Sequence, residues 1–354
     1  MAFLSFPNVR IAGLSAGVPR RVVNNLGLKS FSEDYDAAAF VEATGVLERR
    51  IDDLTTSDLC IAAAENLIHD LGWDKAEIDG VIFVSQTTDY YEPATACIVQ
   101  NRLGLSKECY AEDIVLGCSG WVYGLSNAAS LVTRGCMKKV LLMAGDAKRH
   151  AEPNDPLFGF AGTVTALEYK EGSKDLSFHF GTDGSGYDAI IIPDGGSRNP
   201  VTVKSFEEEM IDGKLVNRLQ TRMKGMDVFS FGISTAPKSI KRLADHFGLD
   251  YLDYDYFVFH QANMKMNNMI AKKLKLAPEK VPSCMRYFGN TSSASIPLTI
   301  VTQLKGIVED THTKFICCGF GVGLSWGTVA FETDNVVISD LVEVESIEGG
   351  SEWV

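Results

Sequence analysis

Positive charge is scarce in this sequence. Its 354 residues include 33 lysines and arginines against 46 aspartates and glutamates, so the formal net charge at pH 7 is -13. The phosphates of a nucleic acid would be repelled by such a chain unless it carried a strong local basic surface. We therefore expect no nucleic-acid partner.

The sequence also has little that suits a membrane. Its longest stretch without charge, 114–133, is interrupted by several glycines and serines, which makes it too polar to cross a bilayer as a helix. The first ten residues lack a basic segment, and Pro7 and Arg10 break their apolar stretch, so they do not read as a signal peptide. These features predict a cytoplasmic protein without a membrane partner.

Paired cysteines and metal-ligand clusters are missing as well. The eight cysteines form no CxxC pair, and no group of cysteines and histidines has the spacing of a zinc site. Most of the cysteines stand in apolar runs. We expect reduced, mostly buried thiols and no structural metal.

What the sequence does contain is a regular alternation of short apolar runs and helical segments. An amphipathic helix is predicted over 55–71, with Thr56 and Ser57 as candidate N-caps and Gly72 as its end. Buried strands are predicted at 80–85, 114–116 and 139–145. Such alternation is typical of layered α/β folds.

The second half of the chain repeats this order. Strand-and-turn units ending at residues 85, 118 and 145 recur at 260, 290 and 319, at offsets of 172 to 175 residues. A shared offset of this size predicts a duplicated domain and not a solenoid. We expect one half over 1–172, a second over 173–332, and a peripheral acidic tail over 333–354.

Cys118 is the first candidate for chemistry. It stands between Gly117 and Ser119, where a strand is predicted to turn into a helix. The positive end of the helix dipole favours a thiolate, so we expect a lowered thiol pKa. A buried core cysteine is the alternative.

His260 and Asn290 are the other two candidates. His260 ends a predicted strand, and Asn290 begins a polar turn that leads into a helix. Taken singly, they could be a core histidine and a helix cap. The duplication, however, would bring Cys118, His260 and Asn290 to one centre, and a thiol beside two hydrogen-bond donors suits acyl transfer.

A glycine-rich segment, 319–327, follows another predicted strand. Its GxGxxxG spacing and the strand-like residues after it argue against a nucleotide-binding loop. A loop that offers backbone N–H groups is the better interpretation.

Together these motifs resemble the beta-ketoacyl-acyl-carrier-protein synthase III family. The resemblance runs in order from about residue 8 to residue 332. It implies a thiolase-like αβαβα fold, a homodimer, and an acyltransferase of fatty acid biosynthesis and lipid metabolism. The motifs that carry it are Thr44–Arg50, Gly117-Cys118-Ser119-Gly120, Met223–Phe229, Phe259–Asn263, Gly289-Asn290-Thr291 and Gly319–Gly327.

The resemblance also implies roles for these residues. Cys118 would take an acyl group from a thioester of CoA or of acyl-carrier-protein phosphopantetheine. His260 and Asn290 would assist decarboxylation of a malonyl thioester, whose enolate then attacks the acyl group in a Claisen condensation. The backbone N–H groups of Cys118 and Val322 would form the oxyanion hole, and Phe320 would lie against the cysteine. No metal or redox cofactor is implied.

Docking of the acidic carrier requires a basic surface despite the net charge. The stretch 261–290 holds six basic residues and one acid. Lys265, Lys272 and Lys273 match basic family positions that dock the carrier, and the first two share a helix face. A solvated helix face is the alternative.

The sequence departs from the family at several positions around the substrate. Ala39 and Ala43 replace residues that hold the CoA adenine, the loop after Asp155 is short, and the usual Phe-Gly-Asp-Gly reads Phe158–Ala161. Glu92 stands at a pocket position that is usually apolar, and Val322 replaces a glycine. These departures favour a carrier-linked donor or a polar acyl chain over short acyl-CoA.

Three other functions remain open at this point. The same residues could transfer an acyl group to an amine or hydroxyl in a specialised-metabolite or surface-glycan pathway. An inactive partner subunit is a second alternative, although such subunits usually lose the cysteine. A plastid-type or polyketide-type synthase is the third.

Overall fold

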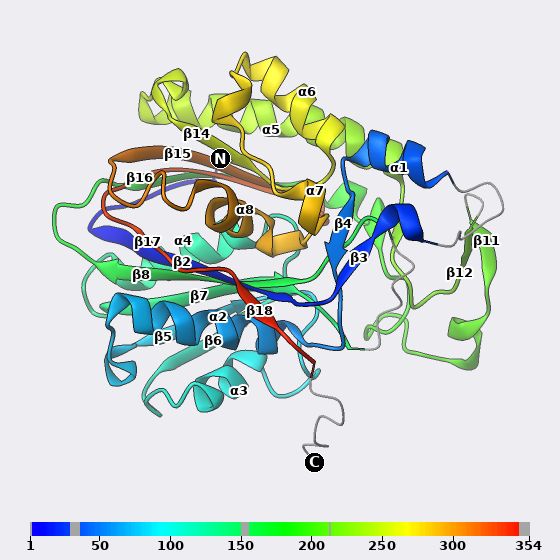
Figure 1. The fold of residues 1–354 in the computed structure, drawn as a ribbon, viewed down its shortest axis with the longest axis horizontal. Helices are drawn as coiled ribbons and strands as arrows, with labels where there is room; N and C mark the ends of the chain where they lie inside the picture. The colour runs from blue at the N-terminus through cyan, green and yellow to red at the C-terminus, as the bar shows by residue number, and fades with distance from the viewer. Residues whose placement is uncertain (1, 29–35, 150–155, 212–213, 347–354) are drawn as a thin grey trace.

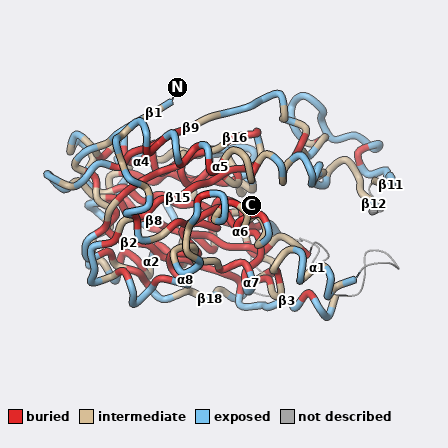
Figure 2. The backbone as a smooth tube through the Cα atoms, turned by 90° about the horizontal axis from the view of Figure 1, so that it is seen from above, coloured by how far each residue is buried: buried red, intermediate tan, exposed pale blue. Residues whose placement is uncertain are grey.

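Two β-sheets lie one above the other, with helices between them and on both outer faces (Figure 1). The computed structural model describes residues 2–28, 36–149, 156–211 and 214–346. The predicted αβαβα layering is confirmed. The most buried backbone runs through the sheets and the helices between them (Figure 2).

The first sheet has the strand order β17-β2-β8-β7-β5-β6, and β18 also pairs with β2. Its central strands are continuous apolar runs because helices cover both of their faces. The strands are β2 (Val9–Pro19), β5 (Gly80–Val84), β6 (Tyr110–Ile114), β7 (Lys139–Asp146), β8 (Ala161–Tyr169), β17 (Val337–Ile338) and β18 (Val342–Val344).

The second sheet has the order β1-β9-β16-β15-β14. Only β14 and β15 are parallel neighbours; the other pairs are antiparallel. Its strands are β1 (Ala2–Phe6), β9 (Leu176–Thr182), β14 (Tyr256–Phe259), β15 (Thr313–Gly321) and β16 (Ser325–Thr333).

The chain passes from the first sheet to the second in the turn between β8 and β9. The expected boundary after residue 172 lies in this turn, but β1 joins the sheet of the other half, and the two-domain division stays a prediction. The acidic tail, expected to be peripheral, belongs in part to the first sheet. Val336 and Ile338 are 2% exposed, and β17 and β18 extend the first sheet beside β2.

The middle layer consists of α4 (Gly120–Val132) and α8 (Ser295–Leu304), which contact strands of both sheets. Helices α2 (Thr56–Leu71) and α3 (Thr95–Arg102) cover the outer face of the first sheet. Helices α5 (Gly225–Phe247) and α6 (Met264–Leu274) cover the second.

Local sequence explains most helix ends, with two corrections. Helix α2 ends at Gly72 as predicted, but its N-cap is Thr55, which forms a capping box with Asp58. The strand predicted at 114–116 is instead β6, which ends at Ile114. Polar residues in this edge strand hide it from an apolar pattern, and Asp113 accepts hydrogen bonds from the first backbone N–H groups of α3.

Short elements complete the fold beside the two sheets. They include α1 (Ala37–Thr44), which contacts α6, and α7 (Met285–Phe288), which contacts β4. Strands β3 (Val22–Asn24) and β4 (Glu48–Arg50) form a separate antiparallel pair.

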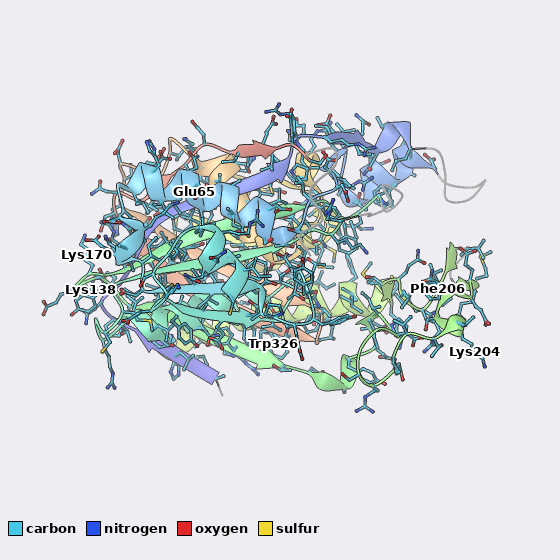
Figure 3. The ribbon with its side chains drawn as sticks, turned by 90° about the horizontal axis from the view of Figure 1, so that it is seen from below. Glu65, Lys138, Lys170, Lys204, Phe206 and Trp326 are labelled. Atoms are coloured by element: carbon cyan, nitrogen blue, oxygen red, sulfur yellow. The ribbon has the colours of Figure 1, made fainter. Side chains whose placement is uncertain are left out.

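A mostly exposed lobe between β9 and α5 extends away from the body, with Lys204 and Phe206 at its far side (Figure 3). It contains β10 (Ile190–Ile191), β11 (Glu209–Ile211), β12 (Lys214–Val216) and β13 (Arg222–Met223).

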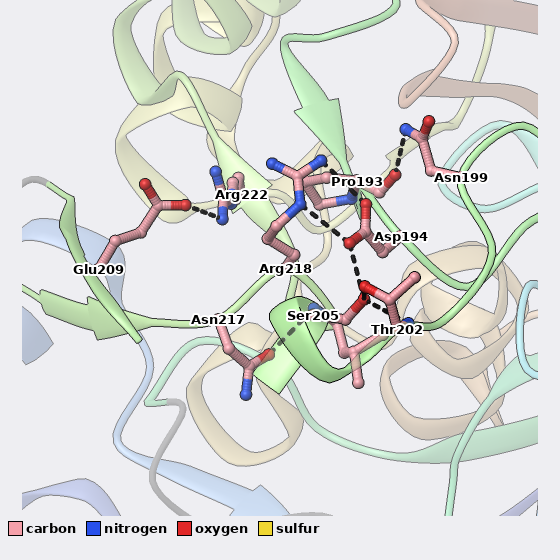
Figure 4. Close-up of polar contacts among 10 residues, drawn as sticks. Pro193, Asp194, Asn199, Thr202, Ser205, Glu209, Asn217, Arg218 and Arg222 are labelled. Carbon is pink, nitrogen blue, oxygen red and sulfur yellow. Dashed lines mark hydrogen bonds and ion pairs between the residues drawn. The ribbon is translucent and has the colours of Figure 1, made fainter. Parts of the chain in front are cut away.

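One buried carboxylate organises this lobe. Both side-chain oxygens of Asp194 accept hydrogen bonds from the Arg218 guanidinium, at 2.9 Å each, and Oδ2 also accepts from Ser205 at 2.8 Å (Figure 4). These bonds hold the pKa of Asp194 below its usual value. The lobe is therefore ordered by polar contacts in place of an apolar core.

No helix in the described part of the chain is both long enough and apolar enough to cross a membrane.

Candidate active site

Ser292, a residue that the sequence analysis did not single out, connects the three candidate residues. Its backbone N–H donates to Asn290 Oδ1 at 2.9 Å. Its side chain lies close enough to the Cys118 thiol to lower that thiol's pKa, and its backbone lies close enough to the His260 ring to raise that ring's pKa. The structure thus brings Cys118, His260 and Asn290 together around one residue.

The backbone of Ser292 adopts an unusual conformation, with φ of 51°. A non-glycine residue in this region costs about 1 kcal/mol, and such residues gather at functional sites. This backbone conformation, which marks Ser292 as a functional residue, cannot be recognised from the sequence alone.

Cys118 lies one residue before Ser119, the N-cap of α4. The expectation of a lowered thiol pKa is wrong: burial raises the pKa of Cys118 to about 11. Hydrogen bonds from the backbone N–H groups of Val322 and Cys118 offset part of this shift, whereas the buried Asp146 carboxylate adds to it. Among the described residues, no cation contributes to the shift, so none supports the helix N-terminus against burial.

His260 is 1% exposed and follows the last residue of β14. Burial lowers the pKa of His260 to about 4, so the imidazole is neutral at pH 7. Its Nδ1 lies 2.8 Å from the Ser295 hydroxyl. If that hydroxyl donates, the proton of the neutral ring is on Nε2, which makes His260 a hydrogen-bond donor towards the site.

Asn290 is held on both sides by backbone. Its N–H donates to Leu157 O at 2.9 Å, and its carbonyl accepts from Gly159 N at 3.1 Å. Because its Oδ1 already accepts from Ser292, the Nδ2 amide protons are the groups left for a substrate.

Arg49, from the segment 44–50 that carries part of the resemblance, supports the backbone next to Asn290. It is fully buried, and its guanidinium donates to Asn25 Oδ1 and to the carbonyl of Phe158. It fixes the strand-like segment against which Asn290 is paired.

The glycine-rich loop packs directly on the nucleophile. A side chain at Gly321 would come within 2.7 Å of Cys118 Sγ, and one at Gly319 within 2.9 Å of the Cys118 carbonyl oxygen. Val322 has no positive φ, so its replacement of a glycine brings no backbone strain. The Ser325 hydroxyl donates to Val322 O and meets Ser119 Oγ, which fixes this loop to the start of α4.

Phe320 is buried beside the site. Its ring meets the His260 ring edge-on, with centroids 5.8 Å apart. The contact expected between Phe320 and Cys118 stays a prediction.

A buried carboxylate that the sequence analysis missed lies next to the thiol. Asp146 Oδ1 accepts hydrogen bonds from Ser85 Oγ, Gln86 N and Thr87 Oγ1 at 3.0, 2.8 and 3.2 Å. Burial raises the pKa of Asp146 above its usual value. Asp146 ends β7 in an apolar run, so only the structure shows that it influences the Cys118 thiol.

The role of Glu92 as a pocket residue stays a prediction. Glu92 is exposed, in the loop after β5, next to Tyr91, whose hydroxyl donates to Gly195 O in the lobe. The family positions Ala39 and Ala43 are exposed on α1. Asp155 and residues 347–354 lie outside the described residues.

The three predicted docking lysines are all exposed on α6. Lys265 and Lys272 line an open depression of about 370 Å³ between α6 and α1, together with Glu42 and Met269. Lys273 instead donates to the Ile233 carbonyl of α5 at 2.9 Å. Lys265 and Lys272 are thus the two lysines at this depression.

The arrangement combines one thiol with four hydrogen-bond donors. Two backbone N–H groups, of Cys118 and Val322, lie near the sulfur. Two neutral side-chain donors complete the site: His260 after β14, and Asn290 in the turn before α8. A thiol with donors of this kind is suited to form and break thioesters and to stabilise a carbonyl oxygen that gains negative charge.

Known proteins resemble this chain over nearly its whole length. Residues 112–184 match the family described as 3-oxoacyl-[acyl-carrier-protein (ACP)] synthase III, and residues 244–333 match its C-terminal part. The beta-ketoacyl-[acyl-carrier-protein] synthase III 1 of Bacillus cereus is 33% identical, over 91% of this chain and 98% of that protein. A putative 3-oxoacyl-[acyl-carrier-protein] synthase 3 of Campylobacter jejuni is 32% identical, over 94% and 98%.

A solved structure also resembles this chain over nearly its whole length. The 3-oxoacyl-(acyl-carrier protein) synthase of Burkholderia xenovorans superposes with a TM-score of 0.88 at 39% identity, over 97% of this chain and 99% of that one.

Proposed function

The chain belongs to the 3-oxoacyl-[acyl-carrier-protein] synthase III family of condensing enzymes, and from this membership we propose a two-step reaction on the residues described above. It is a transferase of the thiolase fold, in a family of fatty acid biosynthesis. The observation that carries the proposal is the convergence of Cys118, His260 and Asn290 on Ser292.

The first step is acylation of Cys118. The sulfur attacks the carbonyl carbon of an acyl thioester of CoA or of a carrier protein, the carbon–sulfur bond to the donor breaks, and the donor thiol takes up the proton lost by Cys118. The negative charge on the carbonyl oxygen during attack is stabilised by the N–H groups of Cys118 and Val322, which lie close enough to the sulfur to lower the pKa of the thiol.

The second step is decarboxylative condensation. A malonyl thioester loses carbon dioxide, and the electron pair of the broken bond forms an enolate. Neutral His260 and the Asn290 amide donate hydrogen bonds to the enolate oxygen. The enolate carbon then attacks the acyl group on Cys118, which forms the carbon–carbon bond and releases the thiolate.

Partners and assembly are part of the same proposal. We expect docking of an acyl carrier protein at Lys265 and Lys272, with Lys273 as a weaker contributor because it is tied to α5. A homodimer, a cytoplasmic location consistent with eight free cysteines, and chemistry without a metal or redox cofactor also remain proposals.

Product analysis tests this function. The protein is incubated with an acyl thioester and malonyl-carrier protein labelled with carbon-13 in its free carboxyl group. Labelled carbon dioxide and a 3-ketoacyl-carrier product are the expected result with the wild type, and the 3-ketoacyl product should be absent with Cys118→Ala. Acylation of Cys118 followed by transfer to an added amine or alcohol, with no carbon dioxide release, would instead support acyl transfer without condensation.

A further inference from the structure

The side chain of Gln86 occupies a place beside the nucleophile. Gln86 follows β5 and Ser85, and its Oε1 lies only 2.0 Å from where a β-carbon would stand on Gly117, the residue before Cys118. Val322 Cγ1 lies 3.0 Å from the same point. Gln86 and Val322 therefore meet over Gly117.

The absence of a side chain at Gly117 makes room for Gln86. Gly117 has no positive φ, so its backbone conformation would accept any L-residue. A larger residue would instead meet the Gln86 amide oxygen, so the flexible Gln86 side chain would have to move away. Glycine at 117 thus lets the Gln86 amide keep this place.

The backbone of Gln86 is fixed, whereas its amide is not. Its N–H donates to Asp146 Oδ1 at 2.8 Å, and the same oxygen holds Ser85 and Thr87 on either side. Among the described residues, none forms a hydrogen bond with the Gln86 side chain, which is exposed. A polar group therefore lies beside Gly117, the neighbour of the acyl-accepting Cys118, with its hydrogen-bonding groups open to a ligand.

We propose that Gln86 is a specificity-determining residue that selects acyl donors carrying a hydroxyl or carbonyl oxygen on the first carbons beyond the thioester. This inference rests on acylation of Cys118 as proposed above. The amide can donate to and accept from such an oxygen, whereas a plain alkyl chain would remove water from the amide and leave it unpaired, which a binding site penalises.

The test measures acylation of the full chain by intact mass and time course. Donors are 3-hydroxybutyryl and butyryl thioesters of equal chain length, each as CoA and as carrier-protein thioester. The wild-type protein is expected to prefer the hydroxylated donor by about tenfold, the ratio that one net hydrogen bond supports. Gln86→Met keeps the length and removes the amide, so it should invert the preference.

Two further variants separate packing from recognition. Gly117→Ala should displace Gln86 and reduce the preference without removing the amide. Gln303→Met, an exposed glutamine on α8, is the matched control and should keep the wild-type preference. The CoA and carrier arms should give the same preference, because Gln86 lies beside the acyl group and not at the docking surface.

The outcomes distinguish this inference from the function on which it rests. Equal acylation by both donors in the wild type, or a preference that survives Gln86→Met, would overturn the role of Gln86 and leave acylation standing. If no donor of the panel acylates Cys118, the acyl-transfer function itself fails, and the inference with it.

Discussion

Two turns of the molecule hold the candidate groups in opposite electrostatic surroundings. The thiol turn, residues 117–119, leads from the first sheet into α4, and the buried Asp146 carboxylate helps to raise the pKa of its thiol. The amide turn, residues 289–295, leads into α8, and burial without a charged neighbour determines the pKa of His260 beside it.

The difference explains how one pocket can serve two half-reactions. Near the thiol turn a raised pKa keeps the sulfur protonated at neutral pH. Near the amide turn a lowered pKa keeps the imidazole neutral, so it donates a hydrogen bond without taking up a proton. The two half-reactions should therefore respond separately to substitution and to pH.

Removing a donor at or beside the amide turn should have the largest effect. We expect His260→Ala or Asn290→Ala to slow decarboxylation of a malonyl thioester by about 100- to 1,000-fold, the usual loss for one donor to a developing oxyanion. Acylation of Cys118 should fall far less. Carbon dioxide release and acylation, the latter by intact mass, are measured on the same samples. Equal loss of both activities would show that the two turns do not act separately.

The pH dependence should differ just as clearly. Below a thiol pKa of about 11, the thiolate fraction rises tenfold per pH unit, so acylation should accelerate by about a hundredfold from pH 7 to pH 9. Decarboxylation should stay level over that range because His260, with a pKa of about 4, is already neutral.

Asp146→Asn sharpens this prediction. Losing a negative neighbour favours the thiolate, so the acylation profile should move to lower pH. The amide oxygen can still accept from Ser85, Gln86 and Thr87. A profile that stays in place would show that Asp146 does not influence the thiol.

The orientation of His260 should have a smaller effect. Ser295→Ala removes the hydroxyl 2.8 Å from Nδ1 and frees the ring to place its proton on either nitrogen. Decarboxylation should slow by about tenfold, the cost of roughly one hydrogen bond, and Ser295→Thr should restore part of it. Acylation is the internal control, since Ser295 lies on the amide turn alone.

The smallest effect is expected outside both turns. Lys265→Glu combined with Lys272→Glu should lower turnover with a carrier-linked donor by about three- to fivefold at low salt, because exposed charges contribute little each. The loss should shrink as salt rises. Lys204→Glu, on the distant lobe, is the matched control (Figure 3).

Much of the fold follows from local sequence. The capped helix α2 and the apolar strands β5 and β7 can be predicted from their own residues. The edge strand β6 does not, because its polar residues serve distant partners such as the start of α3. Strands β17 and β18 cannot be predicted either, because they are recognised as strands only by their pairing with β2.

The site shows the same limit. Cys118, His260 and Asn290 are predictable because each stands at the end of a recognisable strand or turn. The thiol pKa was not, because the dipole of α4 is visible in the sequence while burial and the carboxylate of Asp146, from β7, are not. Gln86 is hidden for the same reason: only its approach to Gly117 gives it importance.

Cys118→Ala tests the central claim, the separation of the two turns, most directly. The variant is incubated with a malonyl thioester alone, and carbon dioxide release is measured beside intact mass with an acyl donor. The account predicts no acyl adduct but carbon dioxide release within about threefold of the wild type, because His260 and Asn290 keep their hydrogen bonds. Loss of carbon dioxide release from a folded Cys118→Ala protein would contradict it.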